Sequence, residues 1–196
     1  MTFALGLTGS IGMGKTTTAR MFADEGIPVW DADETVHRLY AAGGAAVTPV
    51  AKLIPAAIQD GAVSRSKLKE AIASDPDILR KLEEIVHPLV KADREAFRAE
   101  QSGLILFDIP LLFETRADVW LDAVLVVTSP QDVQRQRVLD RPGMTEDQFE
   151  LILSRQMPDS EKRVRADYII ETISLDQTRK EVQNVIADIR GKLPDA

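Results

Sequence analysis

The sequence predicts an α/β fold in which a five-stranded parallel sheet is flanked by helices, and three observations support this prediction. The length of 196 residues, with 44% hydrophobic and 28% charged side chains, suits one globular domain. Helical patterns separate short apolar runs, as in strand–helix–strand units. Five of these runs are continuously apolar, which is typical of strands buried in a parallel sheet: Phe3–Leu7, Ile27–Trp30, Leu104–Phe107, Ala123–Thr128 and Asp167–Ile170.

The first two strands are joined by a helix. Lys15–Glu25 has a helical pattern, and Gly26 stands where helices commonly end. So compact a unit implies a right-handed parallel crossover. We place the sheet core at about residues 1–33, 101–130 and 162–196 of a single domain covering 1–196.

A helical insertion is predicted at about residues 34–100, where no strand signal occurs. Asp75 and Pro76 indicate a helix start, as N-cap and first helical residue. Pro88 is expected to open a further helix that runs through Glu100. The apolar face between these positions consists of Leu79, Leu82 and Val86.

A helical lid is predicted at about residues 131–161, as two helices around a turn at residues 141–145. Thr145 and Gln148 fit a capping box at the start of the second helix. The segment is locally basic through Arg135, Arg137, Arg141 and Arg155. At the chain end, Leu193–Ala196 is expected to fray.

The composition argues against several classes of site and partner. The absence of cysteine excludes disulfides, thiolate zinc sites and thiol catalysis. The formal net charge of −7 argues against nucleic-acid binding through a broad basic face. No apolar run approaches the roughly 20 residues of a membrane helix. We therefore expect a cytoplasmic protein with neither nucleic acid nor membrane as a partner; the sequence does not indicate its oligomeric state.

A phosphate-binding motif follows the first strand. Residues 9–16 match G-x-x-x-x-G-K-[ST] in full. Its glycines allow consecutive N–H groups to turn inward around a phosphate, at the positive end of the following helix. Lys15 is expected to reach the β- and γ-phosphates, and the Thr16 hydroxyl to ligate Mg²⁺. The predicted nucleotide-binding residues here are Gly9, Gly12, Met13, Gly14, Lys15, Thr16 and Thr17.

This P-loop by itself is compatible with GTPase switches, ATPase motors and small-molecule kinases. The fourth strand ends in Val127–Pro130, without the guanine-specifying N-K-x-D pattern. A short chain with a helical insertion and an arginine-bearing lid favours a small-molecule kinase, which must exclude water from ATP. Another kinase of nucleoside monophosphates or sugar acids, or a non-catalytic nucleotide-binding protein, remains an alternative.

Four carboxylates follow the strands and are candidates for chemistry. In an extended chain Asp31 and Asp33 share a face, so one can accept a proton and the other support Mg²⁺. We favour Asp33 as the base, the alternative for either residue being a helix cap. Asp108 is a Walker-B-type carboxylate near the metal or a turn residue, and Glu114 is a substrate-pocket or helix-start residue.

Arginines and histidines provide further candidates. Arg137 and Arg141 are four residues apart on one face of the first lid helix, where they either clamp a phosphoryl group or face solvent. His37 and Tyr40 share a helical face, and His87 is a ligand contact or, from spacing, a cap between two helices. Neither histidine has a partner at metal-ligand spacing.

The order of several motifs resembles the dephospho-CoA kinase family over nearly the whole chain. The P-loop after Leu7-Thr8 is shared by many families, whereas the later segments are more particular. These are Asp31–Asp33 with His37 and Tyr40, His87-Pro88, Pro110–Glu114, Arg137 and Arg141, Arg155–Met157, Lys162 and Ala166–Tyr168.

The resemblance implies a P-loop NTPase fold like that of nucleoside monophosphate kinases and transfer of the ATP γ-phosphoryl, with Mg²⁺, to the ribose 3′-hydroxyl of dephospho-CoA. It implies Asp33 as base, with Lys15 and Arg141 near the phosphates. The implied acceptor-site residues are Thr8, Asp33, His37, Tyr40, His87 and Glu114. The chain departs from the family pattern at Lys91, where arginine is frequent, and at Glu171–Ser174, where an Asn-Gly-type loop near the adenine is common.

Overall fold

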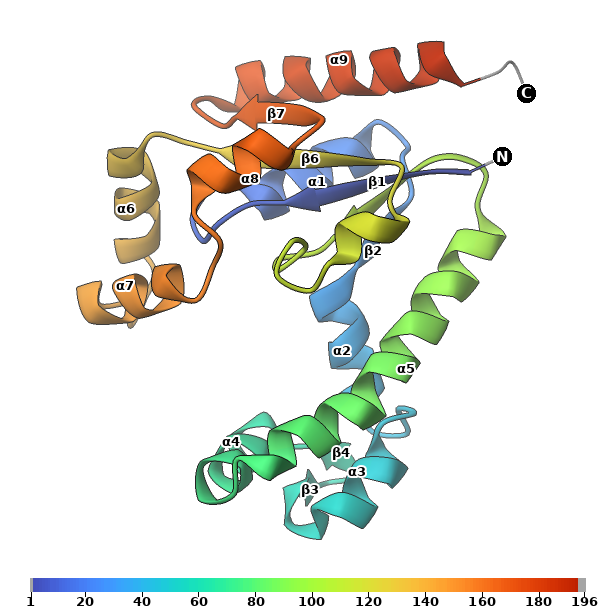
Figure 1. Cartoon of the computed structure of the whole chain (residues 1–196), viewed down its shortest axis with the longest axis vertical. Coiled ribbons are helices and arrows are strands. Elements are labelled where there is room, and N and C mark those ends of the chain that lie inside the picture. Colours follow the sequence, from blue (N-terminus) through green and yellow to red (C-terminus); the bar gives the residue numbers. More distant parts are fainter. Residues whose placement is uncertain (1, 194–196) are drawn as a thin grey trace. The chain divides into compact units, whose positions relative to one another are not determined.

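A computed structural model describes residues 2–193 (Figure 1). Met1 and residues 194–196, most of the tail expected to fray, lie outside the described part. The chain divides into two compact units: Met1–Trp30 with Gln101–Ala196, and Asp31–Glu100. We refer to them as the sheet unit and the helical unit.

The sheet unit is built on five strands in the order β2-β5-β1-β6-β7. Their bounds are β1 (Thr2–Thr8), β2 (Val29–Asp31), β5 (Gly103–Asp108), β6 (Ala123–Thr128) and β7 (Tyr168–Glu171). The β1–β5, β1–β6 and β6–β7 pairs are parallel, with Leu7 opposite Asp108 and Leu125. The predicted five-stranded parallel sheet is therefore confirmed, although Ile27 and Pro28 precede β2 instead of belonging to it.

Both faces of this sheet are covered, as continuously apolar strands require. On one face, α1 (Lys15–Asp24) and α9 (Leu175–Lys192) place Phe22 and Ile189 in a core with Leu125. On the other face, the centroid of the Phe107 ring lies 5.7 Å from that of the Trp30 ring and 5.0 Å from that of the Trp120 ring in η2 (Ala117–Trp120). The carboxyl ends of β1, β5 and β6 are thereby held by packing on both sides.

Three helices occupy the predicted lid: α6 (Gln131–Leu139), α7 (Glu146–Ser154) and α8 (Asp159–Arg165). The capping box of Thr145 and Gln148 at the start of α7 is confirmed, with both reciprocal hydrogen bonds present. Prediction of only two helices was wrong, because Pro158 precedes a further helix whose first turn carries Asp159 and Glu161. The expected lid boundary at residue 161 falls inside α8.

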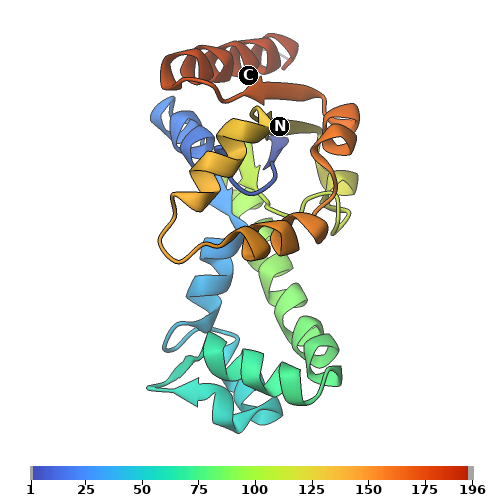
Figure 2. The ribbon, with the colours of Figure 1, turned by 90° about the vertical axis from the view of Figure 1, so that its left-hand side faces the viewer.

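The helical unit has its own core around Val50, Leu68, Leu82 and Val86. Its helices are α2 (Ala32–Tyr40), α3 (Val47–Leu53), α4 (Arg65–Ser74), α5 (Asp77–Glu100) and the short η1 (Pro55–Ala57). The expectation of no strand was wrong: β3 (Ile58–Gln59) and β4 (Ala62–Val63) form a small antiparallel hairpin (Figure 2). Asp60 and Gly61, both with positive φ, make the Asp-Gly turn that signals such hairpins.

Helix α5 differs from its prediction in one respect. The Asp75 side chain accepts a hydrogen bond of 3.0 Å from the N–H of Asp77, so the predicted cap is present. Pro88, however, lies inside one continuous helix and opens no new one. Leu82 and Val86, before the proline, are buried in the core, and Leu89 and Val90, after it, pack against the same core. Leu79 is 45% exposed. Packing thus outweighs the local cost of an interior proline.

Among residues 2–193, none of the helices combines the length and apolar character that crossing a bilayer requires.

Candidate active site

The P-loop motif connects β1 to α1 at the carboxyl edge of the sheet. Gly12 and Gly14 have φ values of +78° and +88°, a region that favours glycine. A β-carbon at Gly9 would lie 2.8 Å from the Val127 carbonyl oxygen, so this position also excludes larger residues. Helix α1 has no side-chain N-cap, and therefore its first N–H groups are available to an anion. The exposed Thr16 and Thr17 lie in the same turn.

Lys15, the first residue of α1, forms an ion pair with Asp108 at the end of β5. Asp108 is the last residue of β5, opposite Leu7 of β1, and is 2% exposed. Its position is that expected of a Walker-B-type carboxylate, one strand away from the P-loop. The pair places one buried negative charge and one partly exposed positive charge beside the loop, which suits binding of a phosphate together with a cation.

Four polar side chains from distant segments hold the outer surface of the P-loop. Gln156 accepts from the N–H of Ile11 (3.0 Å), and Gln134 donates to the Ile11 carbonyl (2.8 Å). The N–H and hydroxyl of Ser129 contact the Met13 sulfur at 3.0 and 3.2 Å, and the Thr172 hydroxyl donates to the Met13 carbonyl (2.9 Å). No role was predicted for any of these four residues. Gln156 and Thr172 lie in segments that bear on the family pattern, Arg155–Met157 and Glu171–Ser174.

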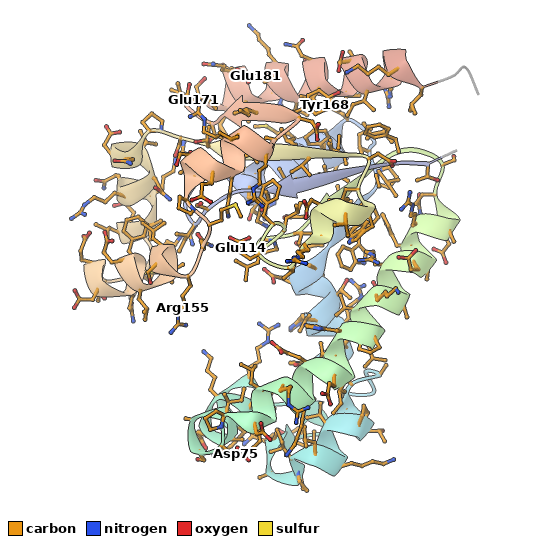
Figure 3. All side chains as sticks on the ribbon, in the orientation of Figure 1. Asp75, Glu114, Arg155, Tyr168, Glu171 and Glu181 are labelled. Atoms are coloured by element: carbon orange, nitrogen blue, oxygen red, sulfur yellow. The ribbon has the colours of Figure 1, made fainter. Side chains whose placement is uncertain are left out.

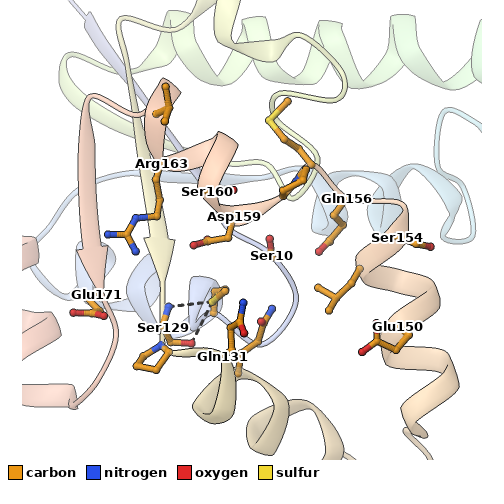
Figure 4. A pocket seen from close by; sticks show the side chains of 17 residues that line it. Ser10, Ser129, Gln131, Glu150, Ser154, Gln156, Asp159, Ser160, Arg163 and Glu171 are labelled. Atoms are coloured by element: carbon orange, nitrogen blue, oxygen red, sulfur yellow. Dashed lines mark hydrogen bonds between the residues drawn. The ribbon is translucent and has the colours of Figure 1, made fainter.

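A cleft of about 930 Å³ opens beside these contacts (Figure 4). Ser10 and Met13 of the P-loop line it together with residues of α6, α7 and α8. Figure 4 shows Asp159 and Arg163 on α8 and Gln156 on the opposite wall, with the two Ser129–Met13 contacts between them. The cleft is therefore lined by the P-loop and by the lid helices, and Gln134 and Gln156 bond the lid segment to the loop.

The two arginines predicted to share a helix face do not do so. Arg137 lies in α6 and donates to the carbonyl (2.5 Å) and hydroxyl (2.9 Å) of Thr172. Arg141 lies beyond the end of α6 at Leu139, in the exposed turn before α7. The helix ends early because Pro142 and Gly143, with φ of +78°, form the turn. Phosphate contact by either arginine remains a prediction.

Thr8 and Glu114 have protein partners in the sheet unit. The Thr8 hydroxyl donates to the Pro110 carbonyl at 3.1 Å. Glu114, in the loop after β5 (Figure 3), accepts from the N–H of Met157 at 2.7 Å and lies 3.3 Å from the ammonium of Lys162. The Lys162 side chain is fully buried. Glu114 thus joins this loop to the segment between α7 and α8, and its predicted contact with the acceptor remains untested.

The Asp31–Asp33 pair differs from its expected geometry. Strand β2 ends at Asp31, whose side chain caps α2 by accepting from the Glu34 N–H at 3.0 Å. The two carboxylates therefore do not share the face of an extended strand, because an N-cap aspartate starts the helix one residue later. The cap alternative is correct for Asp31. Asp33 is exposed in the first helical turn, and its role as base remains a prediction.

The remaining predicted acceptor residues belong to the helical unit. His37 is exposed and Tyr40 half-buried on α2, which is tied to α5 by bonds from Thr35 and Arg38 to Asp93. Burial raises the pKa of the Tyr40 phenol, and the nearby charge of Arg65 opposes this only in part. Tyr40 therefore stays neutral and able to donate a hydrogen bond at physiological pH.

His87 is exposed in the middle of α5. Its interpretation as a cap between two helices was wrong, since the helix is continuous there. A contact between His87 and a ligand remains a prediction.

Comparison with known proteins identifies the family. The family model described as dephospho-CoA kinase matches residues 3–177. This chain belongs to the dephospho-CoA kinase family. A dephospho-CoA kinase of Cereibacter sphaeroides is 59% identical over 189 residues, which is 96% of each chain.

Solved structures share the fold of this chain. The crystal structure of a Thermus thermophilus protein matches with a TM-score of 0.83 at 29% identity, covering 98% of both chains. A dephospho-CoA kinase from Campylobacter jejuni shares the fold, with a TM-score of 0.66 at 23% identity over 96% of this chain and 97% of that one. The family model and the curated relative confirm the resemblance inferred from motif order, at the level of the dephospho-CoA kinase family.

Proposed function

We propose that this chain transfers the γ-phosphoryl group of ATP to the ribose 3′-hydroxyl of dephospho-CoA, giving coenzyme A and ADP. The observation that carries the proposal is the family relationship over nearly the full chain, combined with a complete P-loop. The cradle at the start of α1 and the Lys15–Asp108 pair supply the donor side of such a reaction. The identity of the acceptor is inferred from membership of the dephospho-CoA kinase family.

The catalytic contribution of the chain is positioning and charge neutralisation, because phosphoryl transfer passes through a loose transition state. In our proposal Lys15 leaves Asp108 for the β- and γ-phosphates, and Arg137 and Arg141 offset charge on the transferred group. Asp33 orients the acceptor hydroxyl and takes its proton. His37, Tyr40 and His87 serve the acceptor, and Thr8 and Glu114 shape its surroundings.

Mg²⁺ is proposed as the metal that accompanies ATP, where it neutralises phosphate charge. The donor set fits this ion: the exposed Thr16 hydroxyl and the Asp108 carboxylate are hard oxygen ligands. Within residues 2–193 there is no cluster of three or more His, Cys, Asp or Glu suited to a metal. Magnesium commonly relies on one or two protein oxygens, with phosphates and water completing its shell. A cytoplasmic location without nucleic-acid partners remains a prediction.

An ADP-release assay with a panel of acceptors tests the proposal. The purified chain with MgATP is offered dephospho-CoA, AMP, CMP, gluconate or shikimate at equal concentrations. We expect acceptor-dependent ADP release with dephospho-CoA alone, and phosphate on the 3′-oxygen of the product by NMR. Preference for another acceptor would replace the proposed substrate, and the absence of acceptor-dependent ADP release would favour a nucleotide-binding protein without transfer activity.

A further inference from the structure

Thr172 connects three parts of the nucleotide site that lie far apart in the sequence. It follows β7 directly, is 5% exposed, and stands in the segment Glu171–Ser174, where the chain departs from the family pattern. Its own N–H donates to the Thr128 carbonyl at the end of β6 (2.8 Å), so its backbone continues the sheet ladder. The side chain is therefore delivered to the P-loop from a rigid element.

The first contact of this side chain is with the P-loop backbone. The Thr172 hydroxyl donates to the Met13 carbonyl at 2.9 Å, with the Thr128 carbonyl at 3.2 Å as a second acceptor. The C=O and N–H of a trans peptide point in opposite directions, and no peptide in the described chain is cis. Holding the Met13 carbonyl toward Thr172 therefore turns the Gly14 N–H away from it, free for a phosphate oxygen.

The second contact is with Gly14. It gives a reason for glycine at this position in addition to the φ of +88°. A β-carbon there would lie 3.0 Å from the Thr172 hydroxyl oxygen and 3.2 Å from its Cβ. Thr172 and Gly14 are thus packed against each other, so a change in one shifts the other.

The third contact is with the lid. Arg137 donates from Nη1 to the Thr172 hydroxyl (2.9 Å) and from Nη2 to its carbonyl (2.5 Å). A guanidinium has five N–H donors. These two bonds fix its plane and leave its remaining donors for an anion. The same hydroxyl thus accepts from Arg137 and donates to Met13, which a side chain without both functions cannot do.

We propose that Thr172 is a positioning residue of the donor site, which sets the Met13–Gly14 peptide and the Arg137 guanidinium together for the phosphates of ATP. Thr172 bonds both the P-loop backbone at Met13 and Arg137, a predicted phosphate-binding residue. The inference deepens the proposed function and rests on it only in taking ATP as the donor.

The test compares Thr172→Val, which keeps the shape and removes the hydroxyl, with Thr172→Ser, which keeps the hydroxyl. Because a hydrogen bond to a charged group is lost, we expect the Kd and KM for ATP to rise about tenfold or more in Thr172→Val. The KM for dephospho-CoA should stay within about twofold, since the lost hydrogen bonds belong to the donor site alone. Thr172→Ser should bind ATP within about threefold of the unchanged protein.

A matched control is Thr178→Val in α9. Thr178 is also a buried threonine, 3% exposed, but its hydroxyl bonds to the Ser174 carbonyl at the start of its own helix. We expect its ATP affinity to be unchanged. If Thr172→Val does not fold, as judged by circular dichroism, Thr172→Ala replaces it with the same expected loss of ATP affinity.

Coupling to the arginine gives an independent readout. In a double-mutant cycle with Arg137→Gln, the combined variant should bind ATP little worse than Arg137→Gln alone, because both changes disrupt one unit. Additive losses would overturn the coupling. ATP affinity of Thr172→Val equal to that of the unchanged protein, or a fall in kcat with KM unaltered, would overturn the positioning role.

These binding measurements separate the inference from the proposed function. The Kd for ATP is measured by calorimetry without any acceptor, so it tests Thr172 even if dephospho-CoA proves to be the wrong acceptor. Conversely, a normal Kd in Thr172→Val overturns the inference while activity on dephospho-CoA supports the function.

Discussion

Glu114→Gln tests whether the buried Lys162 depends on a single counter-ion. The Lys162 side chain is 0% exposed, and its ammonium has no hydrogen-bond partner among residues 2–193 apart from the ion-pair contact of 3.3 Å to Glu114. Glutamine preserves the shape of Glu114 and can still accept from the Met157 N–H, which Glu114 does at 2.7 Å. The substitution therefore removes essentially the charge alone.

The expected loss of stability follows from leaving that ammonium uncompensated. Breaking a buried ion pair by removing one partner costs about 3–5 kcal/mol. Because the Glu114 side chain is 20% exposed, water reaches the pair and the lower end of that range applies. For a chain of this length 1 kcal/mol corresponds to about 2–4 °C in Tm, so we expect a fall of roughly 6–12 °C.

Thermal unfolding followed by circular dichroism measures this shift in Tm. Two further variants serve as controls. Lys162→Met removes the buried cation and leaves Glu114 hydrogen-bonded and partly hydrated, so its Tm should change by no more than about 3 °C. The double variant should recover most of the loss seen in Glu114→Gln. An unchanged Tm in Glu114→Gln, or a double variant less stable than either single one, would show that Lys162 does not depend on Glu114 as its counter-ion.

Two other substitutions address the segment after β2. Asp33→Asn should lower kcat about 10²-fold or more, because it removes a positioned base, while ATP affinity stays nearly unchanged. Steady-state kinetics measures kcat and calorimetry measures ATP affinity. Undiminished turnover would remove the assignment of Asp33 as the base. Asp31→Ala should destabilise the chain by about 1 kcal/mol through loss of the α2 cap, whereas Asp31→Ser should recover most of that stability. Urea unfolding measures the free energy of unfolding of each variant. Equal stability of Asp31→Ala and the unchanged protein would contradict the importance of the cap.

Local signals predicted the parts of the molecule whose structure is decided locally. The capping box of Thr145 and Gln148 and the cap at Asp75 involve residues within a few positions of each other, so their side chains and backbone amides meet whatever the tertiary fold. Predictions from spacing alone were wrong at Pro88, which opens no new helix, and at Arg141, which lies outside α6. The proline is retained in α5 because Leu82 and Val86 before it are buried and Leu89 and Val90 after it pack against the same core. Arg141 lies outside its helix because of the turn that follows.

The parallel sheet and the phosphate cradle could be inferred from the sequence, because continuous apolar runs and a P-loop are patterns of residues close in the chain. The family could be inferred from the order of motifs along the chain. The side chains that hold the cradle became evident only in the folded molecule. Thr172 reaches Met13 across 159 positions, and Gln156 reaches Ile11 across 145. Hydrogen bonds at such separations depend on strand order and lid packing, and neither periodicity nor local spacing encodes them.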